Sequence, residues 1–131
     1  MTLVVLDTNI LVSSLWSKGG APSRIVKMVL EKQITPCHDH RIMSEYRRVL
    51  LRPKFHFNPL DVDDVLSFLQ KNGISVIAQS TGVFFSDETD LKFYEVAKTC
   101  SALLITGNRK HYPDESFIVT ARQFLADSAI L

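Results

Sequence analysis

The chain has 131 residues, of which 46% are hydrophobic and 22% charged, values that are ordinary for a globular protein. This length suits one domain with a sizeable core, which excludes a disordered chain and a small protein that depends on disulfides. Fifteen Lys and Arg against fourteen Asp and Glu leave a net charge of +1. Bulk charge therefore cannot bind nucleic acid, and any such site must be a local group of basic residues.

Compartment is indicated by three features of the sequence. No apolar run reaches the roughly 18 residues that a membrane span needs, and Asp7 interrupts the apolar N-terminus. The N-terminus has neither a basic leader nor a small-residue cleavage site, so we expect no secretion signal. Cys37 and Cys100 are far apart in the sequence, and we expect reduced, buried thiols. Together these features predict a cytoplasmic protein with no membrane partner.

Short apolar runs alternate with longer helical patterns along the chain. The run from Thr2 to Leu6 is typical of a strand buried on both faces. Further strands are predicted at about 34–37, 74–78, 102–105 and 117–119. Helices are predicted over about 9–16 and 21–32, from an Asp39 cap to Leu51, from an Asp61 cap to Lys71 with Gly73 ending it, from a Ser86 or Asp87 cap to Ser101, and after the last strand to Ala126. This order predicts a mainly parallel sheet with helices on both faces, and a site beyond the carboxyl ends of its strands.

Two carboxylates fall at positions where chemistry is plausible. Asp7 directly follows the first strand and should stand at the carboxyl edge of the sheet, either as a metal ligand or as a helix cap. Glu45 borders the apolar face that Ile42 and Val49 form at helical spacing. It is either a ligand or a surface carboxylate paired with a neighbouring arginine.

Asp90 is the strongest of the carboxylate candidates. Phe93, Tyr94 and Ala97 follow it at three, four and seven residues, so Asp90 lies at the top of an apolar helix face. An unpaired carboxylate is expensive to desolvate there, and a metal ion would compensate. A reciprocal cap between Asp87 and Asp90 is the compatible alternative.

Thr106 and Asn108 follow the fourth strand and would emerge at the same edge as Asp7, unless Gly107-Asn108 is simply a turn. Carboxylates and an amide converging from separate segments form a hard-oxygen site, which suits Mg²⁺ or Mn²⁺. Such ions polarise phosphoryl oxygens and activate bound water, so hydrolysis of a phosphodiester is the use that the pattern predicts.

Four motifs carry a family resemblance, and they are VVLDTNILVS, SEYRRVLLRPKF, SDETDLKFYEVA and LLITGNRKHYP. In this order they resemble the PIN-domain ribonucleases, in particular the branch of toxin components of toxin–antitoxin systems. The resemblance covers nearly the whole chain, residues 1–131, as a single PIN-like domain. It implies a three-layer α/β/α sandwich with a central, mainly parallel sheet of four to five strands.

The resemblance also implies a set of roles for the residues above. Asp7, Glu45 and Asp90 would bind Mg²⁺ or Mn²⁺ for cleavage of RNA, and Asn9 and Thr106 fall where the family has supporting polar groups. The fourth position is often Asp in this fold, but here it is Asn108. This change removes one negative charge and should weaken a second metal site first, although an amide can still hold a metal-bound water. Asp87, one turn before Asp90, could partly replace the charge.

Basic residues flank the proposed acids. Arg41, Arg48 and Arg52 recur at helical spacing beside Glu45, and Arg109, Lys110 and His111 follow Asn108. Both groups are placed to hold RNA phosphates, although a solvated helix face and a basic turn are the ordinary alternatives. We expect RNA to be held through its backbone, so binding should weaken with salt.

Other motifs point away from competing functions. The run Cys37-His38-Asp39-His40 lacks the second ligand pair of a zinc site, so we expect Cys37 in the core and the histidines on the surface. Trp16 and Phe84-Phe85 could stack on bases, but we expect core or oligomer contacts there. No glycine-rich phosphate loop follows the first strand, and a Ser nucleophile elbow is absent.

These observations predict a Mg²⁺- or Mn²⁺-dependent endoribonuclease acting on single-stranded RNA, with Asp7, Glu45, Asp90 and Asn108 as the catalytic set. The resemblance further implies a homodimer and a cognate antitoxin that inhibits cleavage. The alternative is a catalytically weak PIN-fold module that binds RNA or a protein, for which Asn108 is the main support. A structure-specific DNA nuclease ranks last, because the chain looks too short for threading helices.

Overall fold

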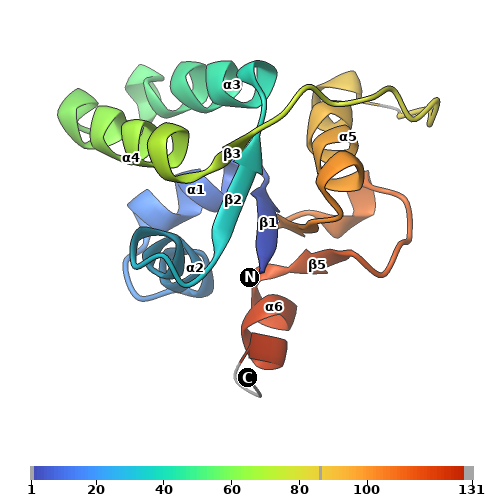
Figure 1. The fold of residues 1–131 in the computed structure, drawn as a ribbon. Helices are drawn as coiled ribbons and strands as arrows, with labels where there is room; N and C mark the ends of the chain where they lie inside the picture. Colours follow the sequence, from blue (N-terminus) through green and yellow to red (C-terminus); the bar gives the residue numbers. More distant parts are fainter. Residues whose placement is uncertain (1, 86, 129–131) are drawn as a thin grey trace.

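The computed structural model describes residues 2–85 and 87–128, and these form a sheet with helices on both faces (Figure 1). The strands are β1 (Leu3–Leu6), β2 (Thr35–His38), β3 (Ile74–Ser75), β4 (Leu103–Thr106) and β5 (Ile118–Thr120). The α-helices are α1 (Thr8–Trp16), α2 (Ala21–Leu30), α3 (His40–Leu50), α4 (Pro59–Asn72), α5 (Leu91–Cys100) and α6 (Ala121–Ser128). Single 3₁₀ turns are η1 (Pro53–Phe55), η2 (Glu88–Asp90) and η3 (Arg109–His111).

The five described strands pair in parallel in the order β3-β2-β1-β4-β5. The chain moves from β1 through β2 to β3 with α1 to α4 on one side of the sheet, and then returns past β1 to β4 with α5 on the other side (Figure 1). This confirms the predicted α/β/α sandwich. The reversal places a topological switch point between β1 and β4, where open parallel sheets bind their ligands.

The core lies on both faces of β1 and β4, as the continuous apolar runs predicted. Val4, Val5, Leu104 and Ile105 are essentially inaccessible to solvent. Among the described residues no helix is long and apolar enough to cross a membrane.

Several element boundaries differ from the prediction. Helix α4 begins two residues before Asp61, because Asn58 accepts the backbone N–H of Leu60 and Pro59 occupies the first turn. The predicted cap at Asp61 is therefore wrong, whereas the caps at Asp39 and Asp87 are confirmed. Strand β3 contains only two of the five predicted residues. Both are exposed, and the strand lies at the edge of the sheet. Ser86 lies outside the described residues.

Cys37 and Cys100 are both free, and they are neighbours although 63 positions separate them in the sequence. Cys37 is buried as predicted, but Cys100 is only partly so. Burial, and next the adjacent Cys100, raise the pKa of the Cys37 thiol to about 12, which keeps it protonated and unreactive.

Histidine and aromatic positions supply further corrections. His38 is buried, not on the surface, because it ends a central strand and its Nε2 lies 2.9 Å from the carbonyl oxygen of Leu69 on α4. Phe85 is in the core as predicted. Trp16 and Phe84 are not in the core, with 62% and 89% of their surfaces exposed, so for these two the alternative of an oligomer contact stays a prediction. The Trp16 ring, at the end of α1, packs edge-on against Phe55 at 5.6 Å between centroids, and also against Phe57.

Candidate active site

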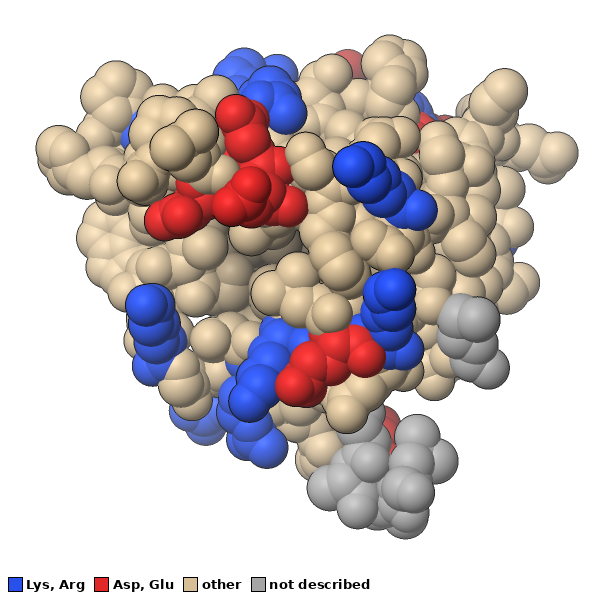
Figure 2. Space-filling view, turned by 60° about the vertical axis from the view of Figure 1, so that its left-hand side comes forward, with Lys and Arg blue, Asp and Glu red and all other residues tan. Residues whose placement is uncertain are grey.

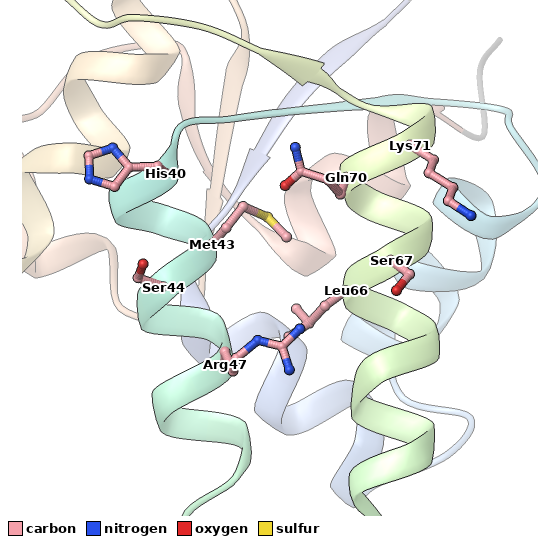
Figure 3. Close-up of a pocket in the computed structure, with 8 residues that line it drawn as sticks. All are labelled: His40, Met43, Ser44, Arg47, Leu66, Ser67, Gln70 and Lys71. Carbon is pink, nitrogen blue, oxygen red and sulfur yellow. The ribbon is translucent and has the colours of Figure 1, made fainter.

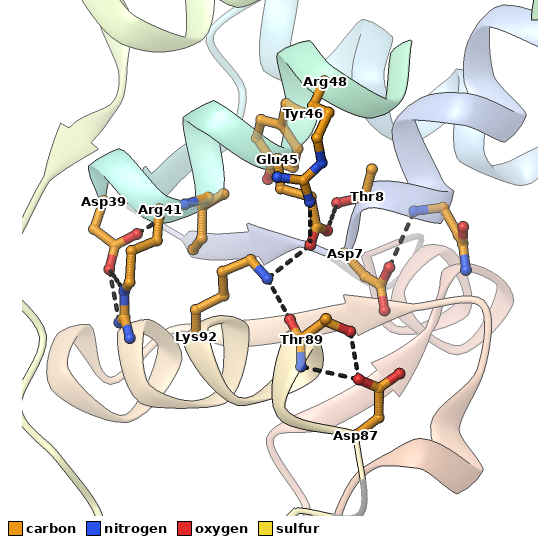
Figure 4. Close-up of polar contacts among 12 residues, drawn as sticks. Asp7, Thr8, Asp39, Arg41, Glu45, Tyr46, Arg48, Asp87, Thr89 and Lys92 are labelled. Atoms are coloured by element: carbon orange, nitrogen blue, oxygen red, sulfur yellow. Dashed lines mark hydrogen bonds and ion pairs between the residues drawn. The ribbon is translucent and has the colours of Figure 1, made fainter. Parts of the chain in front are cut away.

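The topological switch point brings together the three acids that the sequence singled out. Asp7 follows β1, Glu45 extends from the middle of α3, and Asp90 stands between η2 and α5. Figure 4 shows Asp7 and Glu45 on adjacent elements, with Lys92 of α5 between Glu45 and η2. The charges of Asp7 and Glu45 both raise the pKa of Asp90, so the three carboxylates share one electrostatic environment.

Asp7 is buried and held by three donors. Its Oδ1 accepts the backbone N–H of Asn9 at 3.0 Å, which makes it the cap of α1. Its Oδ2 accepts the hydroxyls of Thr106 and Tyr112, each at 2.9 Å. The cap and ligand interpretations are thus compatible, since capping uses one oxygen and leaves the other at the site.

Glu45 is buried on the inward face of α3, and both of its oxygens have partners. Oε2 accepts the hydroxyl of Thr8, while Oε1 lies 2.7 Å from Lys92 Nζ and 3.8 Å from an Arg48 nitrogen. The predicted pair with an arginine therefore exists, but its distance is the longer of the two. Lys92 is the close cation.

Asp90 is the least satisfied of the three. Its Oδ2 is buried and makes no hydrogen bond within the described residues, although His111 Nδ1 lies 3.4 Å away. Burial, and then the charges of Asp7 and Asp87, raise the pKa of Asp90 to about 6, with His111 acting in the opposite direction. The predicted reach of Asp90 back toward its cap is not made, and Asp87 instead accepts the N–H and the hydroxyl of Thr89.

The segment after β4 connects to the same centre. Thr106 is fully buried and joins Asp7 to the chain beyond it, because its hydroxyl oxygen also accepts the N–H of Asn108 at 2.9 Å. The side-chain amide of Asn108 lies 2.9 Å from His111 Nε2. His111 therefore stands between Asn108 and Asp90.

Sequence reasoning did not identify Thr8, Lys92 and Tyr112 as site residues. Thr8 directly follows Asp7, and Lys92 lies two positions after Asp90. This proximity to a predicted acid is a signal that could have identified them. Tyr112 carries no comparable signal, because its contact with Asp7 depends on how η3 turns the chain back toward β1. Burial and the charge of Asp7 raise the pKa of Tyr112, so its hydroxyl stays protonated and donates.

The donor set of the site can be compared with what a metal ion requires. Over residues 2–85 and 87–128, no group of three His, Cys, Asp or Glu side chains is arranged as it stands to hold a metal ion. The acids are nevertheless oxygen donors of the type that Mg²⁺ and Mn²⁺ prefer. The buried Oδ2 of Asp90 accepts no hydrogen bond from residues 2–85 or 87–128, and a cation would satisfy it. The residues present therefore fit a hard divalent ion, provided that Glu45 is not held by Lys92.

A second acidic group at this end of the sheet is already bound by an arginine. Arg41 binds Asp39 at 2.8 Å and Glu95 at 3.0 Å, and both carboxylates are buried. Arg41 was predicted to contact RNA, and in the structure its guanidinium is committed to this pair of acids. Its predicted role in RNA binding stays a prediction.

The remaining predicted basic residues are accessible. Arg48, 64% of whose side chain is exposed, lines a hollow of about 540 Å³ next to Glu45 and Lys92. Arg52 and Lys110 are exposed, and Arg109 contacts the exposed Asp114 at 3.2 Å. On another face of the molecule, acidic and basic side chains form small separate groups (Figure 2). No single charge sign dominates that face.

A second hollow, of about 380 Å³, lies between α3 and α4 (Figure 3). Its lining includes Met43, Arg47 and Gln70, and none of the three acids contributes to it. It is therefore separate from the carboxylate centre.

Comparisons with known proteins agree with this architecture. A model of the PIN domain matches residues 3–110, which include all three acids and Asn108. The uncharacterized protein MJ1680 of Methanocaldococcus jannaschii is 31% identical over 109 residues, covering 81% of this chain and 70% of that protein. A crystal structure of VapBC2 from Rickettsia felis, bound to a DNA fragment from their promoter, contains a chain with a similar fold. Its TM-score is 0.56 at 12% identity, and the match covers 91% of this chain and 97% of that one. The chain described here belongs to the PIN domain family.

Proposed function

We propose that this protein is a metal-dependent endoribonuclease that hydrolyses phosphodiester bonds of single-stranded RNA. The observation that carries the proposal is a cluster of three carboxylates at the switch point of a parallel sheet, with one buried oxygen of Asp90 that has no hydrogen bond within the described residues. Structural carboxylates in a folded protein are normally satisfied, so an orphaned one beside two others favours a cation site.

Asp7, Glu45 and Asp90 would hold the Mg²⁺ or Mn²⁺ ion. When bound, such an ion polarises the phosphoryl group and lowers the pKa of an attacking water. Thr106 and Tyr112 fix the rotamer of Asp7 through its Oδ2, so that this carboxylate needs little reorganisation during the reaction. His111 lies next to Asp90 and also contacts the amide of Asn108, and we assign these two residues the orientation of water at that side.

We assign the RNA backbone to the hollow beside Glu45. Arg48 is the lining cation with the most freedom, since its nearest carboxylate oxygen is 3.8 Å away. Its planar guanidinium suits a phosphate. We therefore expect RNA affinity to fall with salt, and to fall further in Arg48→Gln.

The decisive experiment is cleavage of a panel of single-stranded RNAs with Mg²⁺, Mn²⁺ or EDTA. Asp7→Asn keeps a good cap residue but loses the charge, and we expect it to reduce cleavage at least about 100-fold. Asp63→Asn, at an exposed carboxylate on α4, is the matched control and should cleave normally. Metal-dependent cleavage lost only in Asp7→Asn would support the proposal. No cleavage by folded protein across the panel and both metals would instead favour a PIN-fold module that binds RNA or protein.

We further propose that the protein is the toxin component of a toxin–antitoxin pair, and that it forms a homodimer. Its fold is shared with a chain of a VapBC complex, which supports a search for such a partner. A small protein encoded beside this chain should bind it and block cleavage in a purified mixture. Absence of any inhibitory neighbour would remove the toxin assignment and leave the nuclease assignment standing. Light scattering on the isolated protein tests the dimer.

A further inference from the structure

Among the ion pairs of the described residues, Lys92 makes the shortest contact with a predicted metal ligand. Its ammonium lies 2.7 Å from Glu45 Oε1, and each of the two side chains is only 12% exposed. The contact crosses from α5 to α3, so it joins two helices on either side of the acidic cluster (Figure 4).

The ammonium is held by more than Glu45. It donates to the carbonyl of Thr89 and lies 5.1 Å from the centroid of the Phe93 ring, which is a cation–π contact. Because the Glu45 oxygen, the carbonyl and the ring surround it, this lysine is pre-ordered and loses less entropy in pairing than an exposed one.

Lys92 compensates only one of the three acids. Thr8 and Lys92 together satisfy both oxygens of Glu45, whereas Oδ2 of Asp90 is left without a hydrogen bond. In the described part of the chain, no three acidic side chains are arranged for a metal as they stand. One of the three faces a lysine.

We propose that Lys92 is the resident counter-ion of Glu45 and competes with the divalent metal ion for it. Two cations on one carboxylate oxygen repel each other, so an ion can take Oε1 of Glu45 only when Lys92 leaves. The apparent metal affinity is then lowered by the fraction of molecules in which Glu45 is free. The inference rests on the proposed function, and it assigns this site a built-in control over metal uptake.

The first test measures Mn²⁺ binding by calorimetry at pH 8, without RNA. Lys92→Met should bind Mn²⁺ about tenfold more tightly than the unmodified protein, because the competing state is gone. Lys98→Met is the matched control on the same helix. Lys98 also lies near a carboxylate, Glu115 at 3.6 Å, and near a ring, Phe117 at 5.5 Å. This control removes the same charge, and its affinity should stay unchanged.

The second test measures melting temperature in EDTA, and it does not depend on metal binding. Lys92→Met should lower the melting temperature by several degrees, since it leaves Glu45 buried without a counter-ion. Adding Glu45→Gln to Lys92→Met should restore most of the loss. This double variant also provides a folded protein if the single one is unstable.

The outcomes separate this inference from the proposed function. Equal or weaker Mn²⁺ affinity in Lys92→Met, in a protein that still cleaves RNA, would overturn competition and make Lys92 a residue that orients Glu45 for the metal. No Mn²⁺ binding by any variant would overturn both proposals. An unchanged melting temperature in Lys92→Met would show that Lys92 is not the counter-ion of Glu45.

Discussion

Two acidic clusters lie side by side at the carboxyl end of the sheet, and they are built in opposite ways. In one, Arg41 bridges the buried carboxylates of Asp39 and Glu95 with contacts of 2.8 and 3.0 Å. In the other, which consists of Asp7, Glu45 and Asp90, the closest cation is Lys92 at 2.7 Å from Glu45, and an oxygen of Asp90 has no hydrogen bond among the described residues. In the first cluster each carboxylate contacts the arginine, and these contacts join α3 to α5. The second carries excess negative charge, which is the condition a cation site requires.

The largest expected effect is on RNA cleavage, and it distinguishes Glu45 from Glu95. Both glutamates are buried, and sequence composition cannot tell them apart. Glu45→Gln should reduce metal-dependent RNA cleavage by at least about 100-fold, because it removes a ligand charge. Glu95→Gln should leave cleavage within a few-fold of normal, because Glu95 faces Arg41. Steady-state cleavage rates of both variants, checked for folding by circular dichroism, test this difference. Equal losses would mean that both clusters serve the reaction.

The second prediction concerns stability rather than cleavage. Here we expect the large loss in the Arg41 cluster, which the first prediction treats as unimportant for cleavage. Arg41→Met leaves two buried carboxylates without their cation, and we expect a loss of about 2 kcal/mol in the free energy of unfolding. This figure is reduced from that of a fully buried pair because 40% of the Arg41 side chain is exposed. Urea denaturation measures it. A loss below about 0.5 kcal/mol would show that solvent compensates Asp39 and Glu95.

The third prediction uses the raised pKa of Asp90, about 6 against an ordinary 3.8. The folded protein binds this proton more tightly than the unfolded chain does, so metal-free stability should fall as pH rises from about 4 to about 6 and stay reduced above it. Asp90→Asn should remove this decrease and stabilise the protein at pH 8 in EDTA by on the order of 2 kcal/mol, with little effect at pH 4. Urea titrations across this range test it. If the difference in stability between Asp90→Asn and the wild type were the same at pH 4 and pH 8, the assigned pKa of Asp90 would be contradicted.

The smallest effect is expected at an exposed ion pair. Arg47 lies 2.6 Å from Asp63, a shorter distance than any contact in the Arg41 cluster, but each side chain is more than half exposed. Arg47→Met should therefore change the free energy of unfolding by no more than about 0.5 kcal/mol. A loss comparable to that of Arg41→Met would mean that distance, not burial, sets the contribution of these pairs.

The strands and the three acids were predictable from the sequence because they depend on local patterns. The apolar run before Asp7 and the helical spacing around Glu45 and Asp90 contain the needed information. The partners of these acids were not predictable in the same way. Tyr112 reaches Asp7 only through the turn η3, and Lys92 differs from other helix lysines only in what α3 places opposite it. The same limitation applies to His38, whose burial depends on the packing of α4 against β2.

The exposed end of α1 has a practical consequence for spectroscopy. The chain contains a single tryptophan, Trp16, and its ring packs edge-on against Phe55 and Phe57 at the far end of the helix that Asp7 caps. Fluorescence excited in the indole absorption band therefore reports on the surroundings of Trp16 alone, and it needs no label or mutation. A protein or RNA that covers this surface would shift the emission, whereas an ion bound at the Asp7 end of the helix would leave it largely unchanged. One emission spectrum can thus separate partner docking from metal uptake.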